Sequence, residues 1–261
     1  MKLLFLTGSL LASTATVSKA ESQSQSAPLN FGIFDWIHNS EGGFYSPKQT
    51  FRRDEKTGLA AGVFAKERIE KNEVLLTVPW DLILRSDNPE EEGQMFCGTV
   101  AAVAREMRLG DESKFAPYAN YLNSQGNDQL PSSWTPAGQE LLRSIVGGEV
   151  EEPEIPPTEP TEWLSYDWNY RCDGKSRDAV SAKAAMLVVQ RSDDHIMIPA
   201  YDMYNHRNGK WFNTRTDTEL EVNHVTKATR VIEAGEQIYV SYDQCEECSG
   251  REIGYGTGGE C

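Results

Sequence analysis

The chain lacks a dense run of basic residues, and this absence argues against a nucleic-acid-binding protein. It has 25 Lys and Arg residues against 40 Asp and Glu residues, so its formal net charge is -15 at pH 7. A protein that binds nucleic acid needs a basic face to contact the phosphates. The acidic balance instead suits a basic protein segment as partner, although such a charge also serves solubility alone.

The chain also lacks the short motifs of several common enzyme classes. It contains no Gly-x-Ser-x-Gly nucleophile elbow, no phosphate-binding loop and no His-Glu-x-x-His zinc motif. Its four histidines are His38, His195, His206 and His224. Their spacing is not typical of a metal cluster, so no metal site is predicted.

Long apolar runs are absent except at the N-terminus. Lys2 precedes an apolar run from Leu3 to Leu11, and Ser18-Lys19-Ala20 provides the small residues of a cleavage site. The run is too short to span a bilayer. Residues 1–20 are therefore predicted to be a signal peptide that leads to secretion, the ER lumen or an organelle reached through that pathway. A wrongly assigned gene start is the alternative. No membrane span is expected after its removal.

Cysteine is scarce, and its pattern is ambiguous. The five residues are Cys97, Cys172, Cys245, Cys248 and Cys261. The Cys-x-x-Cys spacing at 245–248 fits half a zinc site, a redox pair or a local disulfide. A structural zinc usually needs four ligands, and only Cys261 lies nearby. In an oxidising compartment a local disulfide is at least as consistent, and the odd count leaves one thiol unpaired.

The remaining composition is that of a soluble globular domain. The 261 residues are 39% hydrophobic and 25% charged, which suits one domain that carries a substantial insertion. Residues 21–30 are rich in Ser and Gln and are predicted to be a disordered leader. The domain is expected to extend over residues 31–256, with residues 257–261 as a short tail and a monomer as the assembly.

The first part of the domain predicts a short helix followed by two strands. The helix is expected over residues 31–37, and the polar, partly basic residues 46–57 are expected to form a surface loop. The small residues at 58–62 would allow another group to approach the backbone closely. Strands are expected at Val63–Ala65 and Val74–Val78, around a turn at residues 70–72. Taken alone, this pattern is a hairpin.

The middle of the chain changes to helical periodicity. Helices are predicted over residues 94–109 with Gly110 as C-cap, 114–122, 135–146 and 179–191 with Asp178 as N-cap. The aromatic residues of these helices are typical of core positions. Residues 149–162 are rich in Glu and Pro and predict an extended, solvated linker. A helical insertion is thus expected over about residues 90–190.

Two short motifs follow the last helix. An apolar strand is predicted at Ile196–Tyr201, and it leads into Asp202-Met203-Tyr204-Asn205-His206, with Asn208-Gly209 after them. A Gly-Glu turn at 235–236 then precedes an alternating strand that ends at Tyr242. Each motif alone is an ordinary turn or hairpin signal.

Taken together and in this order, these segments resemble the motifs of the SET-domain protein methyltransferases. Residues 58–79 resemble the opening motif, in which a Gly-x-Gly loop precedes an apolar strand, although Ala60 replaces the first glycine. The motifs at 202–206 and 235–243 resemble the two closing motifs. Residues 111–118 and 130–134 resemble the helical insertion of one subgroup. That subgroup includes the Rubisco large-subunit lysine methyltransferase and the actin histidine methyltransferase.

The resemblance implies a fold and an activity. The fold would be α+β: short β-sheets around a threaded, pseudoknot-like C-terminal segment, interrupted by an α-helical insertion. The activity would be methylation of a protein lysine with S-adenosylmethionine as cofactor. Such a reaction needs a neutral amine aligned with the methyl group in a site that excludes water. A protein histidine is the alternative acceptor.

The resemblance also assigns roles to particular residues. The cofactor would be bound by Ala60, Ala61, Gly62, Arg191, Asp202, Met203, Tyr204, Asn205 and His206. Backbone groups near Asn205 and His206 would bind the adenine, and the Asn205 side chain would face the amino-acid end. Arg191 is equally explained as a cation favoured at a helix C-terminus. Tyr242 would be the catalytic phenol, whereas Tyr239 would face the other side of the strand and pack.

One departure concerns the end of the chain. Related proteins continue with an apolar helical segment and a Tyr-Gly-Phe that closes the lysine channel. Here Tyr255-Gly256 is followed by threonine, and the sequence ends at Cys261. The expectation is a truncated C-terminal segment without the helical substrate domain of the subgroup. A catalytically impaired SET module that binds a basic peptide is therefore a third hypothesis.

Overall fold

The computed structural model describes residues 32–53, 61–88, 95–126, 134–146, 172, 178–207 and 209–242. Several predicted features lie outside these residues: the signal peptide, the leader, Ala60, the linker at 149–162, the Cys-x-x-Cys motif and the C-terminal segment.

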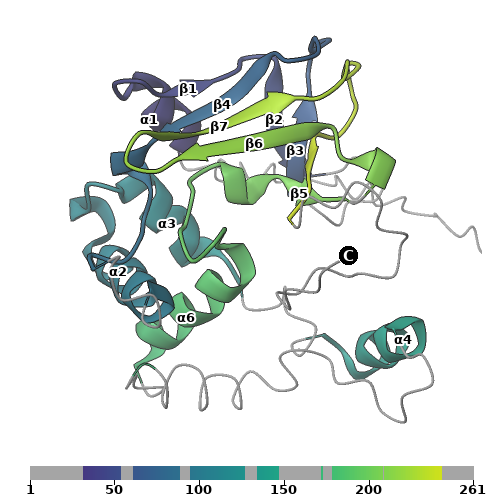
Figure 1. The fold of residues 1–261 in the computed structure, drawn as a ribbon. Coiled ribbons are helices and arrows are strands. Elements are labelled where there is room, and N and C mark those ends of the chain that lie inside the picture. The colour runs from purple at the N-terminus through teal and green to yellow at the C-terminus, as the bar shows by residue number, and fades with distance from the viewer. Residues whose placement is uncertain are drawn as a thin grey trace, which may run out of the picture.

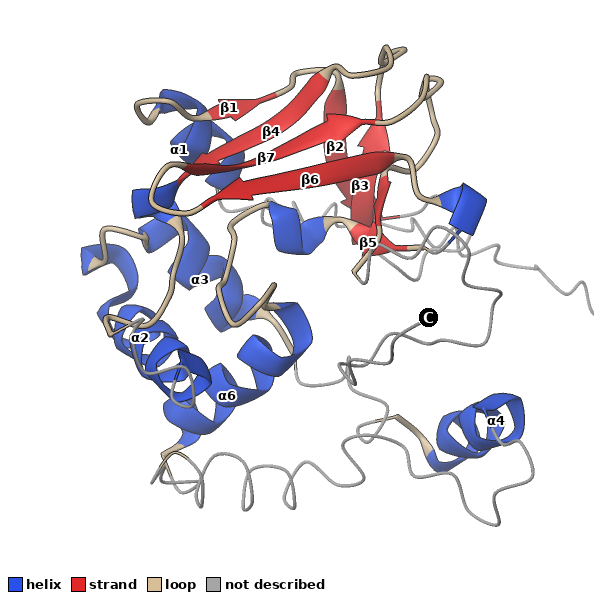
Figure 2. Ribbon diagram, in the orientation of Figure 1, coloured by secondary structure: helices blue, strands red, loops and turns tan. Residues whose placement is uncertain are grey.

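Strands gather in the upper part of the view in Figures 1 and 2, and most of the helices lie below them. The helices are α1 Ile33–Asn39, α2 Met95–Leu109, α3 Ala116–Ser124, α4 Pro136–Val146 and α6 Ala179–Arg191. The strands are β1 Phe44–Tyr45, β2 Gln49–Arg53, β3 Ala61–Ala65, β4 Val74–Pro79, β5 Asn205–His206, β6 Thr214–Glu219, β7 Asn223–Ala228 and β8 Tyr239–Val240. Short 3₁₀ turns occupy Trp80–Leu82, Gly110–Glu112, Tyr201–Met203 and Gly209–Trp211.

The strands form three small sheets. One has the antiparallel order β1-β4-β7-β6, a second pairs β2 with β3, and a third pairs β5 with β8 in parallel. Burial alternates along β6 and β7, so one face of the first sheet packs on the core and the other meets solvent. This α+β arrangement agrees with the predicted fold class. In the described residues no helix is long and apolar enough to cross a membrane.

The helices follow the sequence prediction closely. The Asp178 side chain accepts the N–H of Val180 at 3.2 Å and caps α6, and a proline opens α4. Gly110 has a φ of +53° at the end of α2, where an L side chain would be strained. Helix α2 packs against α3 and α6 to form one helical layer beside the sheets.

The strands differ from the prediction in three places. Residues 49–53, expected in a surface loop, form β2 and pair along their whole length with β3. The strands predicted at Val63–Ala65 and Val74–Val78 are confirmed as β3 and β4, but they do not form a hairpin with each other, because β3 pairs with β2 whereas β4 pairs with β1 and β7. Pairing with β3 makes a strand of this mostly polar segment, in which Thr50 and Phe51 also favour strands.

The predicted strand at Ile196–Tyr201 is also wrong. Ile196 and Met197 form isolated bridges, and the chain then turns into the 3₁₀ turn at 201–203. Pro199 has no N–H for a ladder, and Ala200 has a φ of +66°. The segment is apolar because residues 197–200 are buried in the core, not because they form a strand.

A disulfide that was not predicted joins Cys97 in α2 to Cys172. The two residues are 75 positions apart, so the bond closes a long loop and reduces the entropy of the unfolded chain. We expect the double variant Cys97→Ser/Cys172→Ser to lose about 4 kcal/mol of unfolding free energy. Urea unfolding of the oxidised chain and of the variant measures this loss. Equal stability of the two proteins would show that the bond does not form in solution.

His224 is a buried titratable group in β7. Its Nδ1 lies 2.8 Å from the Thr218 hydroxyl, its Nε2 lies 3.3 Å from the Thr226 hydroxyl, and its ring lies 4.3 Å from that of Tyr201. Burial lowers its pKa from 6.5 to about 4. The folded protein therefore keeps this imidazole neutral at pH values where the unfolded chain protonates it.

This difference makes folding stability depend on pH. Between pH 7 and pH 5 the unfolded chain gains a proton at His224 that the folded chain does not, so the unfolding free energy should fall by about 2 kcal/mol. Urea titrations at several pH values measure the fall, with His224→Gln as control because glutamine does not titrate. Parallel pH curves for the two proteins would contradict the assignment.

Candidate functional site

Segments that are far apart in the sequence meet where β5 pairs with β8. Asn205 lies opposite Tyr239, and His206 lies opposite Val240. The residue before β8 also contacts β3, because the N–H of Ile238 donates to the carbonyl of Val63 at 2.8 Å. The Asp202–His206 motif, the β3 strand and the end of β8 are thereby brought to one place.

Gly62 lies against two amide side chains. A Cβ at this position would come within 2.3 Å of Nε2 of Gln237 and 2.7 Å of Nδ2 of Asn205. The same Nδ2 donates to the carbonyl of Ala61 at 3.2 Å. A side chain at position 62 would therefore displace the ends of the Asn205 and Gln237 side chains, and Asn205 is anchored on the backbone of β3.

Tyr242 is held against His206. Its backbone N–H donates to Nδ1 of His206 at 2.9 Å, and the two rings stack with centroids 4.7 Å apart. Because Nδ1 accepts this bond, the neutral imidazole carries its proton on Nε2. The Tyr242 hydroxyl donates to the backbone carbonyl of Tyr204 at 3.3 Å. Both predicted motifs therefore contact each other directly.

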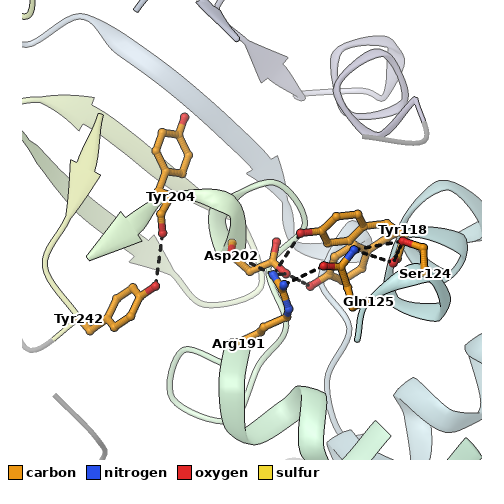
Figure 3. A network of polar contacts seen from close by, with 8 residues as sticks. Tyr118, Ser124, Gln125, Arg191, Asp202, Tyr204 and Tyr242 are labelled. Atoms are coloured by element: carbon orange, nitrogen blue, oxygen red, sulfur yellow. Dashed lines mark hydrogen bonds and ion pairs between the residues drawn. The ribbon is translucent and has the colours of Figure 1, made fainter. Parts of the chain in front are cut away.

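Behind this contact lies a buried polar network, shown in Figure 3. Nη1 of Arg191 donates to the carboxylate and to the backbone carbonyl of Asp202, both at 3.2 Å. It also donates to the Tyr121 hydroxyl at 3.1 Å, and Nη2 donates to Oε1 of Gln125 at 3.0 Å. The Tyr118 hydroxyl donates to the same Asp202 carboxylate at 3.1 Å. The ion pair is almost dry, with side-chain exposures of 7% for Arg191 and 0% for Asp202.

Burial sets the electrostatics of this network. It lowers the pKa of Arg191, but the charge of Asp202 and the two nearby tyrosines raise that pKa by more, so the guanidinium stays charged. Burial raises the pKa of Asp202, and Arg191 and the Tyr118 hydroxyl partly oppose this rise. Burial and the Asp202 charge raise the pKa of both Tyr118 and Tyr121, so their hydroxyls stay protonated.

The predicted residues play different parts in this geometry. Ala61 and Gly62 lie in β3 beside Asn205. Met203 is buried, and the Tyr204 hydroxyl donates into the core to Oε1 of Gln49 at 2.8 Å. Only the backbone carbonyl of Tyr204 reaches Tyr242.

Sequence reasoning missed four members of the site. Tyr118 and Tyr121 were interpreted as core aromatics, and Gln125 and Gln237 were not singled out. The two tyrosines are indeed buried, but their hydroxyls bind Asp202 and Arg191. The usable signal was tyrosine, not phenylalanine, on an apolar helix face, because a buried hydroxyl needs a partner.

A cavity of about 870 Å³ lies elsewhere, and it does not contain any residue predicted for the site. It is bounded by the Trp80–Leu82 turn, α2, the turn after α6 and the β6–β7 turn, and its lining includes Trp80, Phe115, Asp193 and Glu221. In the described part of the chain, no group of His, Cys, Asp and Glu residues is arranged to hold a metal ion. Among the described residues, the site is thus defined by the contacts between its motifs.

Comparison with known proteins agrees with the geometry. A family model described as the SET domain matches residues 60–243. No curated protein matches the chain significantly. Among solved structures, Rubisco LSMT bound to sinefungin and monomethyllysine is 16% identical with a TM-score of 0.57, over 84% of this chain and 53% of that one.

A second similar structure is the SET domain of LSMT bound to lysine and AdoHcy. It is 15% identical with a TM-score of 0.52, over 84% of this chain and 55% of that one. The chain therefore spans about half the length of the solved structures it matches, and the likeness concerns the fold.

Proposed function

Because the chain belongs to the SET-domain family, we propose that it transfers a methyl group from S-adenosylmethionine to a lysine of a protein substrate. The observation that carries this proposal is the direct contact of the two motifs, in which Tyr242 stacks on His206 and bonds to the carbonyl of Tyr204. The similar structures hold AdoMet, AdoHcy or sinefungin, in some cases together with lysine or a methyllysine. This supports the same cofactor and acceptor here.

The groups at the site fit such a cofactor. Oδ1 of Asp202 is buried and accepts no hydrogen bond from the described residues, so it suits an N–H donor such as an amino group. Gly62 keeps the β3 backbone free of a side chain next to Asn205. The half-buried backbone at Asn205 and His206 supplies polar groups for an adenine. Asp202, Asn205 and His206 would hold the cofactor, with the β3 backbone beside them.

Bound S-adenosylmethionine would supply an activated methyl group on a sulfonium. The protein has to align an amine with it and remove water. The Tyr242 phenol, held by the carbonyl of Tyr204, would orient the amine for in-line attack. A lysine must first lose its proton, because only the neutral amine carries a free electron pair. An aromatic surface such as the His206–Tyr242 pair would favour the neutral form once the bound substrate covers it and displaces water.

A non-catalytic module that binds a basic peptide is the competing proposal. Methyl transfer requires that water be excluded from the site. Tyr242 is 53% exposed to solvent, and this exposure favours the non-catalytic module. The net charge of -15 suits a basic peptide under both proposals. A protein histidine is an alternative acceptor for the same phenol.

Calorimetry and a methyl-transfer assay separate these proposals. The mature chain is titrated with S-adenosylmethionine and then incubated with the labelled cofactor and a cell lysate, and the labelled residue is identified. If the chain binds S-adenosylmethionine and the labelled methyl group is found on a lysine, the proposal is supported. A labelled histidine would identify histidine, not lysine, as the acceptor. Binding of a Lys-rich peptide without any label favours the module. If the chain does not bind S-adenosylmethionine, the proposal that it is a methyltransferase is wrong.

We further propose that the chain works in an oxidising compartment. The Cys97–Cys172 disulfide is of a kind that persists in secreted or lumenal proteins, and residues 1–20 have the pattern of a signal peptide. Localisation of the tagged full-length chain tests this. Retention in the cytosol with both thiols reduced would contradict it.

A further inference from the structure

Helix α3 and its C-cap residue Gln125 direct three polar groups toward the predicted cofactor-binding segment. The Tyr118 hydroxyl donates to Asp202, the Tyr121 hydroxyl accepts from Arg191, and Oε1 of Gln125 accepts from the same guanidinium. Figure 3 shows the Tyr118 and Gln125 side chains converging on Arg191 and Asp202. The helical insertion thus contacts the motif through specific polar bonds as well as apolar packing.

The direction of the Gln125 amide is determined by helix α3 itself. Nε2 donates to the carbonyl of Tyr121 and to the hydroxyl oxygen of Ser124, both at 3.1 Å. The Ser124 hydroxyl in turn donates to the Tyr121 carbonyl at 2.7 Å, so its oxygen is free to accept. With both of these partners on the Nε2 side, the amide oxygen faces Arg191.

Arg191 connects Gln125 to the turn that contacts Tyr242. Its Nη1 binds the carbonyl and the carboxylate of Asp202, which lies within a 3₁₀ turn. The turn is closed by the N–H groups of Met203 and Tyr204, which donate to Ala200 and Tyr201. The carbonyl of Tyr204 then accepts the Tyr242 hydroxyl. A continuous path of bonds leads from α3 to the phenol.

We infer that Gln125 is a positioning residue for the methyl-transfer site. The guanidinium is a rigid planar fork, so an acceptor that holds Nη2 also determines where Nη1 points. Gln125 thereby keeps Nη1 on Asp202 and fixes the turn whose carbonyl holds the Tyr242 hydroxyl. The catalytic half of this inference rests on the proposed function, whereas the structural half does not.

Hydrogen exchange tests the structural half without cofactor. Gln125→Met keeps a side chain of similar length but removes the acceptor. We expect the amides of Met203 and Tyr204 to exchange about tenfold faster, the effect of losing one hydrogen bond to a charged group. Amides that pair β4 with β7 should be unchanged.

Two further variants make this test specific. Tyr121→Phe removes another Arg191 acceptor and should accelerate the same two amides. Asn120→Leu removes an amide on the same helix that donates to Asp111 at 2.7 Å, and it should leave them unchanged. Unchanged exchange in Gln125→Met, or acceleration spread over the whole protein, would overturn the inference.

A double-mutant cycle tests the catalytic half. Gln125→Met should lower kcat about tenfold in the wild-type background, as a small misalignment of reacting groups would. In the Tyr242→Phe background it should lower kcat little further, because the hydroxyl that Gln125 helps to position is already absent. If Gln125→Met lowers kcat by the same factor in both backgrounds, Gln125 does not act by positioning Tyr242. If the wild type transfers no methyl group, the proposed function fails, and the exchange result alone decides the inference about Gln125.

Discussion

Replacing Tyr242 with phenylalanine should lower the rate of methyl transfer about a hundredfold or more and leave S-adenosylmethionine binding unchanged. The variant loses only the hydroxyl, which the structure places on the carbonyl of Tyr204. Its ring can still stack on His206, and its backbone N–H can still donate to Nδ1. Single-turnover rates with labelled cofactor and calorimetric affinities measure the two effects separately.

Tyr239→Phe is the matched control. Tyr239 lies in β8, and its hydroxyl donates to Oε1 of Gln237 at 2.8 Å, so the control also removes a bonded phenol. Its rate should stay within the order of magnitude of the wild type. An active Tyr242→Phe, or equal losses in both variants, would rule out Tyr242 as the catalytic residue.

The Arg191→Met variant should lose about 3–5 kcal/mol of unfolding free energy. The side chain of Asp202 has no exposed surface, so removing the guanidinium leaves a carboxylate buried without its counter-ion. Urea unfolding at neutral pH measures the loss. The double variant Arg191→Met/Asp202→Leu should be more stable than Arg191→Met, because it no longer buries a charge.

Arg230→Met provides the comparison at the surface. Arg230 pairs with Glu236, and the two side chains are 43% and 38% exposed. An ion pair of this kind is worth about 0–1 kcal/mol. If Arg191→Met costs no more than Arg230→Met, the Arg191–Asp202 pair is not buried in solution as it is in this structure.

The helices show how much of the fold local sequence can predict. The N-cap at Asp178, the proline that opens α4 and the glycine that ends α2 are signals carried by one to three residues. Helix hydrogen bonds connect residues four apart, so these signals and the apolar periodicity are sufficient. Each predicted helix of the described chain accordingly lies within about two residues of its observed bounds.

The strands show the opposite case. Residues 49–53 are mostly polar and pair with β3 along their whole length, whereas Ile196–Tyr201 is apolar without being a strand. Strand pairing joins residues that are distant in the sequence, so the partner determines the structure more than local preference does. The expected hairpin failed for the same reason, since β3 and β4 joined different sheets.

The candidate site divides along the same line. The sequence by itself predicted which residues would carry the chemistry, because the motif at 202–206 and Tyr242 are recognisable as short patterns. Only the tertiary structure decided what holds them. Tyr118 lies 84 positions from Asp202, and Gln125 lies 66 positions from Arg191. Such bonds have no sequence period, because they depend on how α3, α6 and the 3₁₀ turn pack together. The motif residues could therefore be picked out from the sequence, whereas the hydrogen-bond network that orients them could not.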